Sequence, residues 1–380
     1  MNIEKIASGW IETETPFTYH GWPTLCKLPG GDLLAVASGG RESHLCPFGR
    51  IYCYRSADGG LTWSKPQRLS AGPLDDRDCG ITVAGDGSIL LNYFTSTAFT
   101  MLQEYIIGRK DPVKWPELQK KMLREFHHSI EISEAWCEKM QEINLDVMAR
   151  EHGFWMRRST DNGKTWSEKY AVPVNNVHGP TLLQDGSLLW VGREKSGNFV
   201  QTATFGDKVK AFASHDNGLT WQLLSQLPEM PGMDQRRFYE VHSIQTADGM
   251  IISQIRCDCN TGCIGETYTL QTESYDGGRT WGPYRRIFDG HPTHLLKLSD
   301  GRLLTTYGWR QRPFGIRCRF GLDLPQQFWE EEVVLTDDGE SLDLGYPSTV
   351  QLDDGSFVTL WYQFRSAEHL ALLRWLKWRA

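Results

Sequence analysis

The sequence predicts an all-β fold: a six-bladed β-propeller with a helical insertion in its second blade. Two interleaved repeats support this prediction. A turn motif, Ser-x-Asp-x-Gly-x-Thr-Trp, occurs four times, and a strand–turn–strand pattern occurs six times. Together they give units of roughly 55 residues with four short strands each, which is the pattern typical of a propeller.

The first repeat has the chemistry of a tight hairpin turn. Its copies cover residues 56–63, 159–166, 214–221 and 274–281. Ser and Asp side chains bond the amides of their own turn, Gly takes the positive φ, and Trp packs against the sheet. We therefore expect each copy to close the outer hairpin of a unit.

The second repeat is a pair of apolar strands joined by a turn that is Asp-Gly in five of the six copies, a strong hairpin signal. The copies cover residues 22–41, 80–94, 179–193, 241–256, 292–310 and 347–363. Successive turn glycines lie 52 to 63 residues apart, except for one spacing of 99. The last unit lacks its outermost strand, and we expect the N-terminal segment IEKIASGWI to supply it and close a single domain over residues 1–380.

The long spacing predicts an insertion over residues 100–153. This stretch is rich in Leu, Glu, Lys, Met and Gln, with apolar residues three to four apart, so it is expected to form amphipathic helices. It is either a surface decoration or a lid or dimer contact, which makes a homo-oligomer conceivable through this segment.

Composition excludes several functions. The formal charge of −7 argues against a nucleic-acid partner or a polybasic membrane surface, and no apolar stretch is long enough for a membrane helix. The N-terminus carries charges where an export signal would be apolar, so a cytoplasmic location is expected. Nine cysteines suit free thiols, and the cluster Cys257, Cys259 and Cys263 lacks metal-ligand spacing, so neither a metal nor another cofactor is expected.

Polar side chains gather where the inner strands begin and where the second strands end, positions that face the axis of a propeller. Six predicted units contribute them: Arg41, Glu42 and His44; Asp75, Asp76, Arg77 and Asp78; His178, Arg193 and Glu194; Arg236, Arg237, Tyr239, Glu240, His242 and Arg256; His291, His294 and Arg310; and Tyr346 and Tyr362. Six equivalent positions with such residues favour a binding or catalytic site over scattered surface polarity. We expect Arg41, Arg77, His178, Arg193, Arg256, His291 and Arg310 to bind substrate.

The four turn motifs resemble the Asp boxes of the sialidase superfamily, whose members are six-bladed propellers. The resemblance covers nearly the whole chain outside the insertion. It implies Tyr346 in DLGYPS as nucleophile, Glu240 in FYEVHS as the group that activates it, and Arg256 and Arg310 as two of three carboxylate-binding arginines. Planar guanidinium groups suit a carboxylate, and a neutral Tyr avoids repulsion at an anionic sugar.

The chain departs from the family at two places. Gly21 stands where the first arginine is expected, so the third guanidinium is missing or comes from Arg41 or Arg77. The loop after the first hairpin has no Asp acid/base, which leaves Glu42 and His44 there, or Asp76 and Asp78 at the start of unit two. Among these Asp78 is favoured because it directly precedes an inner strand.

The sequence supports three functions. The first is a retaining, sialidase-like exo-glycoside hydrolase that releases sialic acid or a related 2-keto sugar acid from a glycan. The second is another carbohydrate-active enzyme, a lyase or a glycosidase acting on uronate-containing or neutral sugars, suggested by Gly21 and the His-rich centre. The third is a propeller that binds glycans or protein without catalysis.

Overall fold

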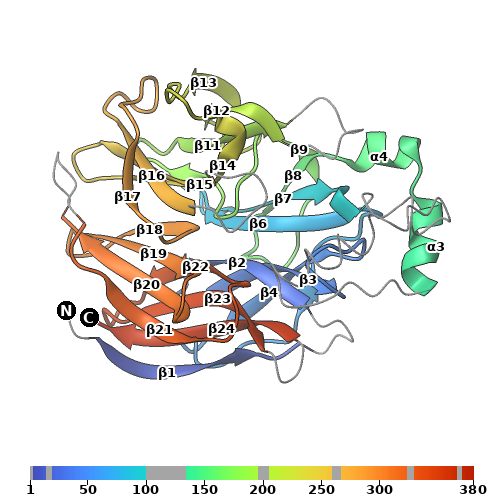
Figure 1. The fold of residues 1–380 in the computed structure, drawn as a ribbon, viewed down its shortest axis with the longest axis horizontal. Coiled ribbons are helices and arrows are strands. Elements are labelled where there is room, and N and C mark those ends of the chain that lie inside the picture. The colour runs from blue at the N-terminus through green and yellow to red at the C-terminus, as the bar shows by residue number, and fades with distance from the viewer. Residues whose placement is uncertain are drawn as a thin grey trace.

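The computed structural model describes residues 3–13, 19–99, 134–195, 205–258, 267–322, 329–365 and 370–380. Nearly all of its regular structure is β, arranged as sheets around a central axis (Figure 1). Two short helices, α3 (Glu134–Glu142) and α4 (Leu145–Glu151), project at one side. Among the described residues, none of the helices has the length and apolar character needed to cross a membrane.

Among the described residues, four separate antiparallel sheets have four strands each. They are β6–β9 (Asp75–Val83, Ile89–Ser96, Phe154–Ser159, Tyr170–Ala171), β10–β13 (Thr181–Leu182, Leu188–Lys195, Phe205–Ser214, Gln222–Gln226), β14–β17 (Phe238–Gln245, Ile251–Asp258, Thr267–Ser274, Arg285–Phe288) and β18–β21 (Thr293–Lys297, Leu303–Trp309, Phe314–Gly321, Val333–Gly339). A 3₁₀ turn, η3 (Gln235–Arg237), precedes β14.

The other eight strands form one sheet. It contains β22–β24 (Leu344–Gln351, Phe357–Arg365, Leu370–Arg379), β1 (Glu4–Ile11) and β2–β5 (Tyr19–Lys27, Leu33–Arg41, Arg50–Ser56, Gln67–Arg68). Its halves meet through one parallel pair, Tyr19 with Ala371. The propeller fold is therefore confirmed, whereas the prediction of six separate blades is not: four sheets stand alone and one is double in width.

The predicted pairing of the N-terminal segment with the last unit is confirmed. Strand β1 runs antiparallel to β24, from Glu4 opposite Arg379 to Ile11 opposite Leu373. Both ends of the chain lie together at the lower left of Figure 1. The first strand thus covers the edge that β24 would otherwise expose.

The repeated turns have the predicted bonding. In the first, Asp58 accepts hydrogen bonds from the amides of Leu61 and Thr62 (3.0 and 2.9 Å), and Ser56 Oγ accepts from the amide of Gly60 (2.8 Å). Gly60 has φ +88°, and the hairpin glycines of the second repeat, such as Gly87 at +79°, are also left-handed. Burial raises the pKa of Asp58, but the hydrogen bonds from Thr62, Ser56 and Leu61 together outweigh it and lower this pKa to about 2. The turns explain the repeat and lie outside the site.

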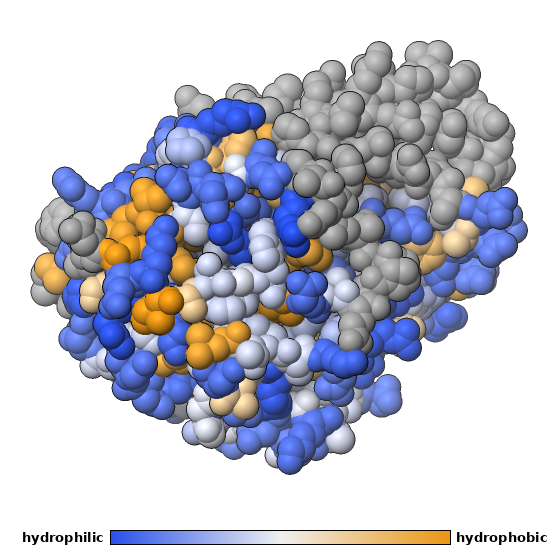
Figure 2. All heavy atoms as spheres, turned by 90° about the horizontal axis from the view of Figure 1, so that it is seen from below, coloured by the Kyte–Doolittle hydropathy of each residue, from blue (hydrophilic) through white to orange (hydrophobic). Residues whose placement is uncertain are grey.

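The two described helices lie between β7 and β8, within the predicted insertion. Trp136 and Met140 of α3 are buried in a small core with Leu74, and Leu45 and Phe48 of the loop after β3 pack against it. Residues 100–133 lie outside the described residues, so the insertion as a whole stays a prediction. On the face shown in Figure 2, the described apolar residues form separate patches among hydrophilic ones.

Candidate active site

Three residues on the innermost strands have a left-handed backbone. Trp22, Asp78 and Tyr346 have φ of +55°, +43° and +52°. Each lies where the register of its strand shifts against its neighbour: β2 on β3, β6 on β7 and β22 on β23. Non-glycine residues avoid this conformation, and outliers of this kind concentrate at functional sites. The bulges turn these side chains into one region at the axis.

Tyr346 and Glu240 are in direct contact there. The Tyr346 hydroxyl donates a hydrogen bond to Glu240 Oε1, from β22 to β14. Tyr346 is only 5% exposed. Burial and the neighbouring charge of Glu240 raise the pKa of the Tyr346 phenol well above its ordinary value, opposed by Arg256. The phenol therefore keeps its proton until Glu240 accepts it.

Arg256 lies on the other side of Glu240. Its Nη1 is 3.3 and 3.4 Å from the two Glu240 oxygens, and its Nε and Nη2 each donate to Asp258 at 3.0 Å. Burial alone would lower the pKa of Arg256, but the charges of Glu240 and Asp258 raise it well above its ordinary value. This guanidinium holds Glu240 in place beside the Tyr346 hydroxyl, on the side where the carboxylate accepts the phenolic hydrogen bond.

Arg310 and His291 complete this side of the site. The Arg310 guanidinium lies 5.7 Å from the centre of the Tyr346 ring, and its Nε donates to the carbonyl of Leu344 at 3.0 Å. His291 is buried, and burial together with the charges of Arg256 and Arg310 lowers its pKa well below its ordinary value. A neutral imidazole therefore stands beside two cations.

Asp78 lines a pocket of about 440 Å³ together with Glu240, Arg193 and Tyr239. Asp78 Oδ1 is buried without a hydrogen-bond partner among the described residues, and Arg77 Nε is 3.9 Å away. Burial raises the pKa of Asp78 to about 6, with Arg77 opposing and Glu240 adding to the rise. A carboxyl group of this kind holds its proton up to about pH 6, well above the range of an ordinary Asp, and can donate it.

Arg193 is also brought to this pocket. Its guanidinium stacks over the Tyr239 ring at 5.0 Å, and Nη1 donates to the carbonyl of Arg236 at 3.0 Å. Burial lowers its pKa, opposed by the nearby Tyr239 and Glu240. Arg193 therefore forms a cationic wall of the pocket that holds Asp78.

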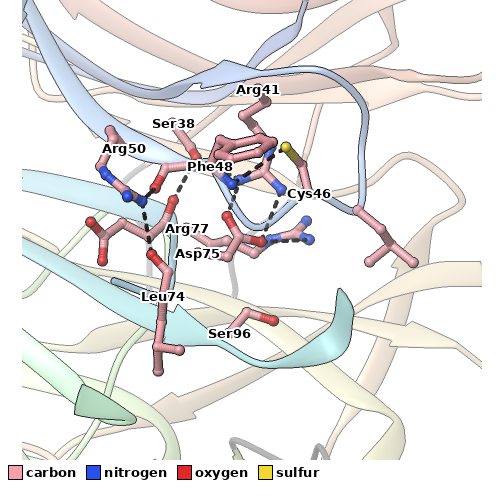
Figure 3. A network of polar contacts seen from close by, with 12 residues as sticks. Ser38, Arg41, Cys46, Phe48, Arg50, Leu74, Asp75, Arg77 and Ser96 are labelled. Carbon is pink, nitrogen blue, oxygen red and sulfur yellow. Dashed lines mark hydrogen bonds and ion pairs between the residues drawn. The ribbon is translucent and has the colours of Figure 1, made fainter. Parts of the chain in front are cut away.

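Arg41 and Arg77 make different contacts with Asp75 (Figure 3). Arg41 is fully buried and clasps Asp75 with both terminal nitrogens, one contact being 3.0 Å, so its guanidinium serves the fold. Its expected role in substrate binding is not supported by this geometry. Both guanidinium groups lie over the Trp22 ring, Arg41 at 5.1 Å and Arg77 at 4.3 Å, but Arg77 stays 3.9 Å from Asp75. Of the two, Arg77 is the guanidinium placed beside the site.

The family assignment follows from a match to the BNR repeat-like domain over residues 144–359. The chain belongs to the BNR repeat-like family of the sialidase superfamily. A sialidase from Micromonospora viridifaciens is 24% identical over 271 residues, which is 70% of this chain and 36% of that protein. The chain thus spans little more than a third of this curated relative.

Two solved structures share the fold. A protein of unknown function from Dyadobacter fermentans has a TM-score of 0.73 at 22% identity, with 99% of each chain covered. The NanB sialidase from Streptococcus pneumoniae has a TM-score of 0.65 at 14% identity, covering 99% of this chain and 70% of that one. At such identities the likeness shows the fold of the family.

Two sequence expectations fall elsewhere in the structure. His178 lines a second opening, of about 1620 Å³, together with His242 and His294 and with residues near the hairpin turns, such as Gln351. Glu42 is on the loop after β3, where its amide donates to Cys46 Sγ (3.4 Å), and it is not among the described residues that line the Glu240 pocket. Neither position brings the side chain to Tyr346.

Gly21 has a structural explanation. A Cβ at this position would lie 3.2 Å from the Tyr19 ring and 3.5 Å from the Tyr362 ring. Both tyrosines donate to a buried carboxylate, Asp343, which is 2% exposed. The place where the resemblance expects an arginine is therefore filled by aromatic rings over an acid.

Sequence reasoning missed Asp343 and the aromatic cluster it anchors. The ring centres of Trp22 and Tyr362 lie 6.5 and 5.9 Å from that of Tyr346. The cluster therefore packs beside the candidate nucleophile. The available signal was an acid three residues before Tyr346 in SLDLGYPS. Nothing in that spacing indicates that tyrosines from β2 and β23 converge on it.

Proposed function

We propose that this protein is a retaining exo-glycoside hydrolase of the sialidase type. The observation that carries the proposal is the Tyr346–Glu240 hydrogen bond, in which a buried phenol donates to a carboxylate that also contacts Arg256. A tyrosine paired with a base is a known alternative to a carboxylate nucleophile in glycoside hydrolysis. A purely glycan-binding site would gain little from this pairing.

In the first step the Tyr346 oxygen attacks the anomeric carbon, and Glu240 takes the phenolic proton. The glycosidic bond breaks as Asp78 donates its proton to the leaving oxygen. In the second step Asp78 removes a proton from water, the water oxygen bonds to the anomeric carbon, and Tyr346 leaves with the proton held by Glu240. Two displacements at one carbon retain its configuration.

We propose an acidic sugar as substrate, either sialic acid or a related 2-keto sugar acid at the end of a glycan. Arg310 flanks the Tyr346 ring, and Arg256 contacts Glu240, the hydrogen-bond partner of Tyr346. Arg77 supplies a third guanidinium from β6, over the Trp22 ring. Arg256 already balances Glu240 and Asp258, so Arg310 and Arg77 carry most of the attraction for a carboxylate. His291 and Arg193 are proposed to contact the sugar and the bound glycan.

We further propose that the eight-stranded sheet is two blades in contact, which makes six blades over a single domain of residues 1–380. The single pair between Tyr19 and Ala371 supports this division, because each half of the sheet has four strands. The site then lies on the axis, and its residues come from β2, β6, β11, β14, β15 and β22, with His291 just before β18 and Arg310 just after β19.

A second candidate is hydrolysis of a neutral sugar. It is favoured by Asp343 and two tyrosines at the place of the expected first arginine, because an acid there opposes a substrate carboxylate. The nucleophile and acid would be the same residues, so only the substrate differs.

Turnover on a panel of fluorogenic glycosides tests both candidates. The panel contains sialic acid, other 2-keto sugar acids, uronic acids and neutral sugars. Release from a 2-keto acid sugar that is lost in Tyr346→Phe and Glu240→Gln supports the first proposal, and release only from a neutral sugar supports the second. Tyr275→Phe, an exposed tyrosine in an outer turn, is the matched control and keeps full activity. Turnover unchanged by Tyr346→Phe would overturn the mechanism.

A further inference from the structure

The carboxylate of Asp343 accepts hydrogen bonds from side chains of two strands, β2 and β23, that β24 separates in the sheet. The Tyr19 hydroxyl is 3.1 Å from each Asp343 oxygen, and the Tyr362 hydroxyl donates to Oδ1 at 2.8 Å. Burial and the charge of Asp343 raise the pKa of Tyr19 well above its ordinary value. Tyr19 therefore keeps its single hydroxyl hydrogen and directs it at Asp343.

This arrangement fixes the tautomer of His44. His44 Nδ1 lies 2.9 Å from the Tyr19 oxygen. Since the Tyr19 hydrogen points to Asp343, the oxygen accepts a bond, and Nδ1 must carry the hydrogen. Nδ1 is also 3.8 Å from Asp343 Oδ1, where a lone pair on Nδ1 would be repelled. In the neutral ring the lone pair is then on Nε2.

The lone pair on His44 Nε2 faces Arg77. Arg77 Nη2 is 3.4 Å from His44 Nε2, and Arg77 Nη1 donates to the His44 carbonyl at 3.1 Å. A guanidinium can only donate, so Nε2 has to be an acceptor, as the Tyr19 contact independently requires. His44 thus contacts both terminal nitrogens of Arg77, while the Arg77 guanidinium lies over the Trp22 ring.

We propose that His44 is a positioning residue for Arg77, held in its Nδ1–H tautomer by Tyr19 and Asp343. These residues form a chain from a buried carboxylate to a guanidinium beside the site. The role of Arg77 in binding the substrate carboxylate rests on the proposed function, whereas the tautomer does not. The loop that carries His44 is supported by Leu45 and Phe48, which pack on the α3–α4 core.

This series of hydrogen bonds, from Asp343 through Tyr19 and His44 to Arg77, explains why a histidine suits position 44. With the hydrogen on Nε2, or on both nitrogens, an N–H would face the N–H groups of Arg77. That contact would be repulsive, and Arg77 would turn away from its place over Trp22. Other charges close to His44 are Asp343, and Arg41, whose Nη2 donates to the His44 carbonyl at 2.8 Å.

Nitrogen NMR of protein labelled with ¹⁵N-histidine tests the tautomer without any substrate. The His44 signal, assigned by its loss in His44→Gln, is expected to show the Nδ1–H form in the wild type. Tyr19→Phe is expected to give a mixture or the Nε2–H form. Tyr362→Phe is the matched control, because it removes the other buried tyrosine hydroxyl on Asp343, and it keeps the Nδ1–H form. An Nε2–H signal in the wild type overturns the proposal even if a variant does not fold.

Enzyme kinetics test whether these hydrogen bonds position Arg77 for substrate binding. On the sugar that the wild type cleaves, Tyr19→Phe is expected to raise KM about fivefold, the effect of one lost hydrogen bond, with a smaller change in kcat. A fall in kcat at unchanged KM would contradict a role in positioning Arg77. If the wild type cleaves no sugar, the proposed function fails, and the NMR result decides the tautomer on its own.

Discussion

Three neutral histidines at the axis make the fold sensitive to acid. The rings of His178, His242 and His294 lie 4.7 to 4.9 Å apart, centre to centre. His242 Nδ1 accepts the amide of Leu295 at 2.8 Å, and burial lowers the pKa of His242 from 6.5 to about 3. In the unfolded chain the same ring titrates near its ordinary value.

The sign and size of the effect follow. Between pH 6.5 and 3 the unfolded state binds a proton at this ring and the folded state does not, so stability falls as the pH falls. At about pH 5 the unfolded state gains roughly 1.5 pH units of protonation free energy, or about 2 kcal/mol from His242 alone. Full stability from this group is present above its unfolded pKa.

His242→Asn isolates this contribution, because Asn Oδ1 can accept the Leu295 amide but does not titrate. Urea denaturation of both proteins at about pH 7.5 and about pH 5 gives the loss on acidification for each. The variant is expected to lose about 2 kcal/mol less than the wild type on this acidification. His20 and His152 are present in both proteins and cancel. Equal losses in the two proteins would refute the reasoning.

Three further predictions concern the site and the closure of the fold. Asp78→Asn removes the proposed acid, so kcat should fall about 10²- to 10⁴-fold. The alkaline limb of the pH–rate profile, expected near pH 6 in the wild type, should disappear in this variant. If the variant retains that limb, the limb belongs to another group. Arg41→Met removes both close contacts to the buried Asp75 and leaves only Arg77, 3.9 Å away, so the free energy of unfolding should drop by about 3–5 kcal/mol. A neutral effect in urea denaturation would show that the Arg41–Asp75 ion pair is dispensable. Deletion of residues 1–12 exposes the edge of β24, so the melting temperature should fall and aggregation should rise, and an unchanged melting curve would contradict the closure by β1.

Much of the fold could be predicted because its signals are local. The turn of Ser56 and Asp58 bonds only within itself, so its motif predicts its geometry wherever it occurs. The Asp-Gly hairpins are equally self-contained. The joining of eight strands in one sheet was not predictable, since it depends on how Tyr19 and Ala371 meet across the whole length of the chain.

The site divides in the same way. Tyr346, Glu240, Arg256 and Arg310 follow from equivalent positions in repeated units, and the structure brings them together. The different uses of Arg41 and Arg77 were not predictable, because the choice depends on which guanidinium reaches Asp75. His178 was misplaced because it lies in the turn before β10 and lines the second opening with His242 and His294, which the spacing of the repeats does not reveal.

Trapping the covalent intermediate tests the central claim most directly. The sugar that the panel identifies is made as a fluorinated glycosyl fluoride, which slows the second step, and the labelled protein is digested and analysed by mass spectrometry. The account predicts one sugar bound to the peptide that contains Tyr346, and no label in Tyr346→Phe. A label on Glu240 or Asp78, or release of a product with inverted configuration, would contradict it.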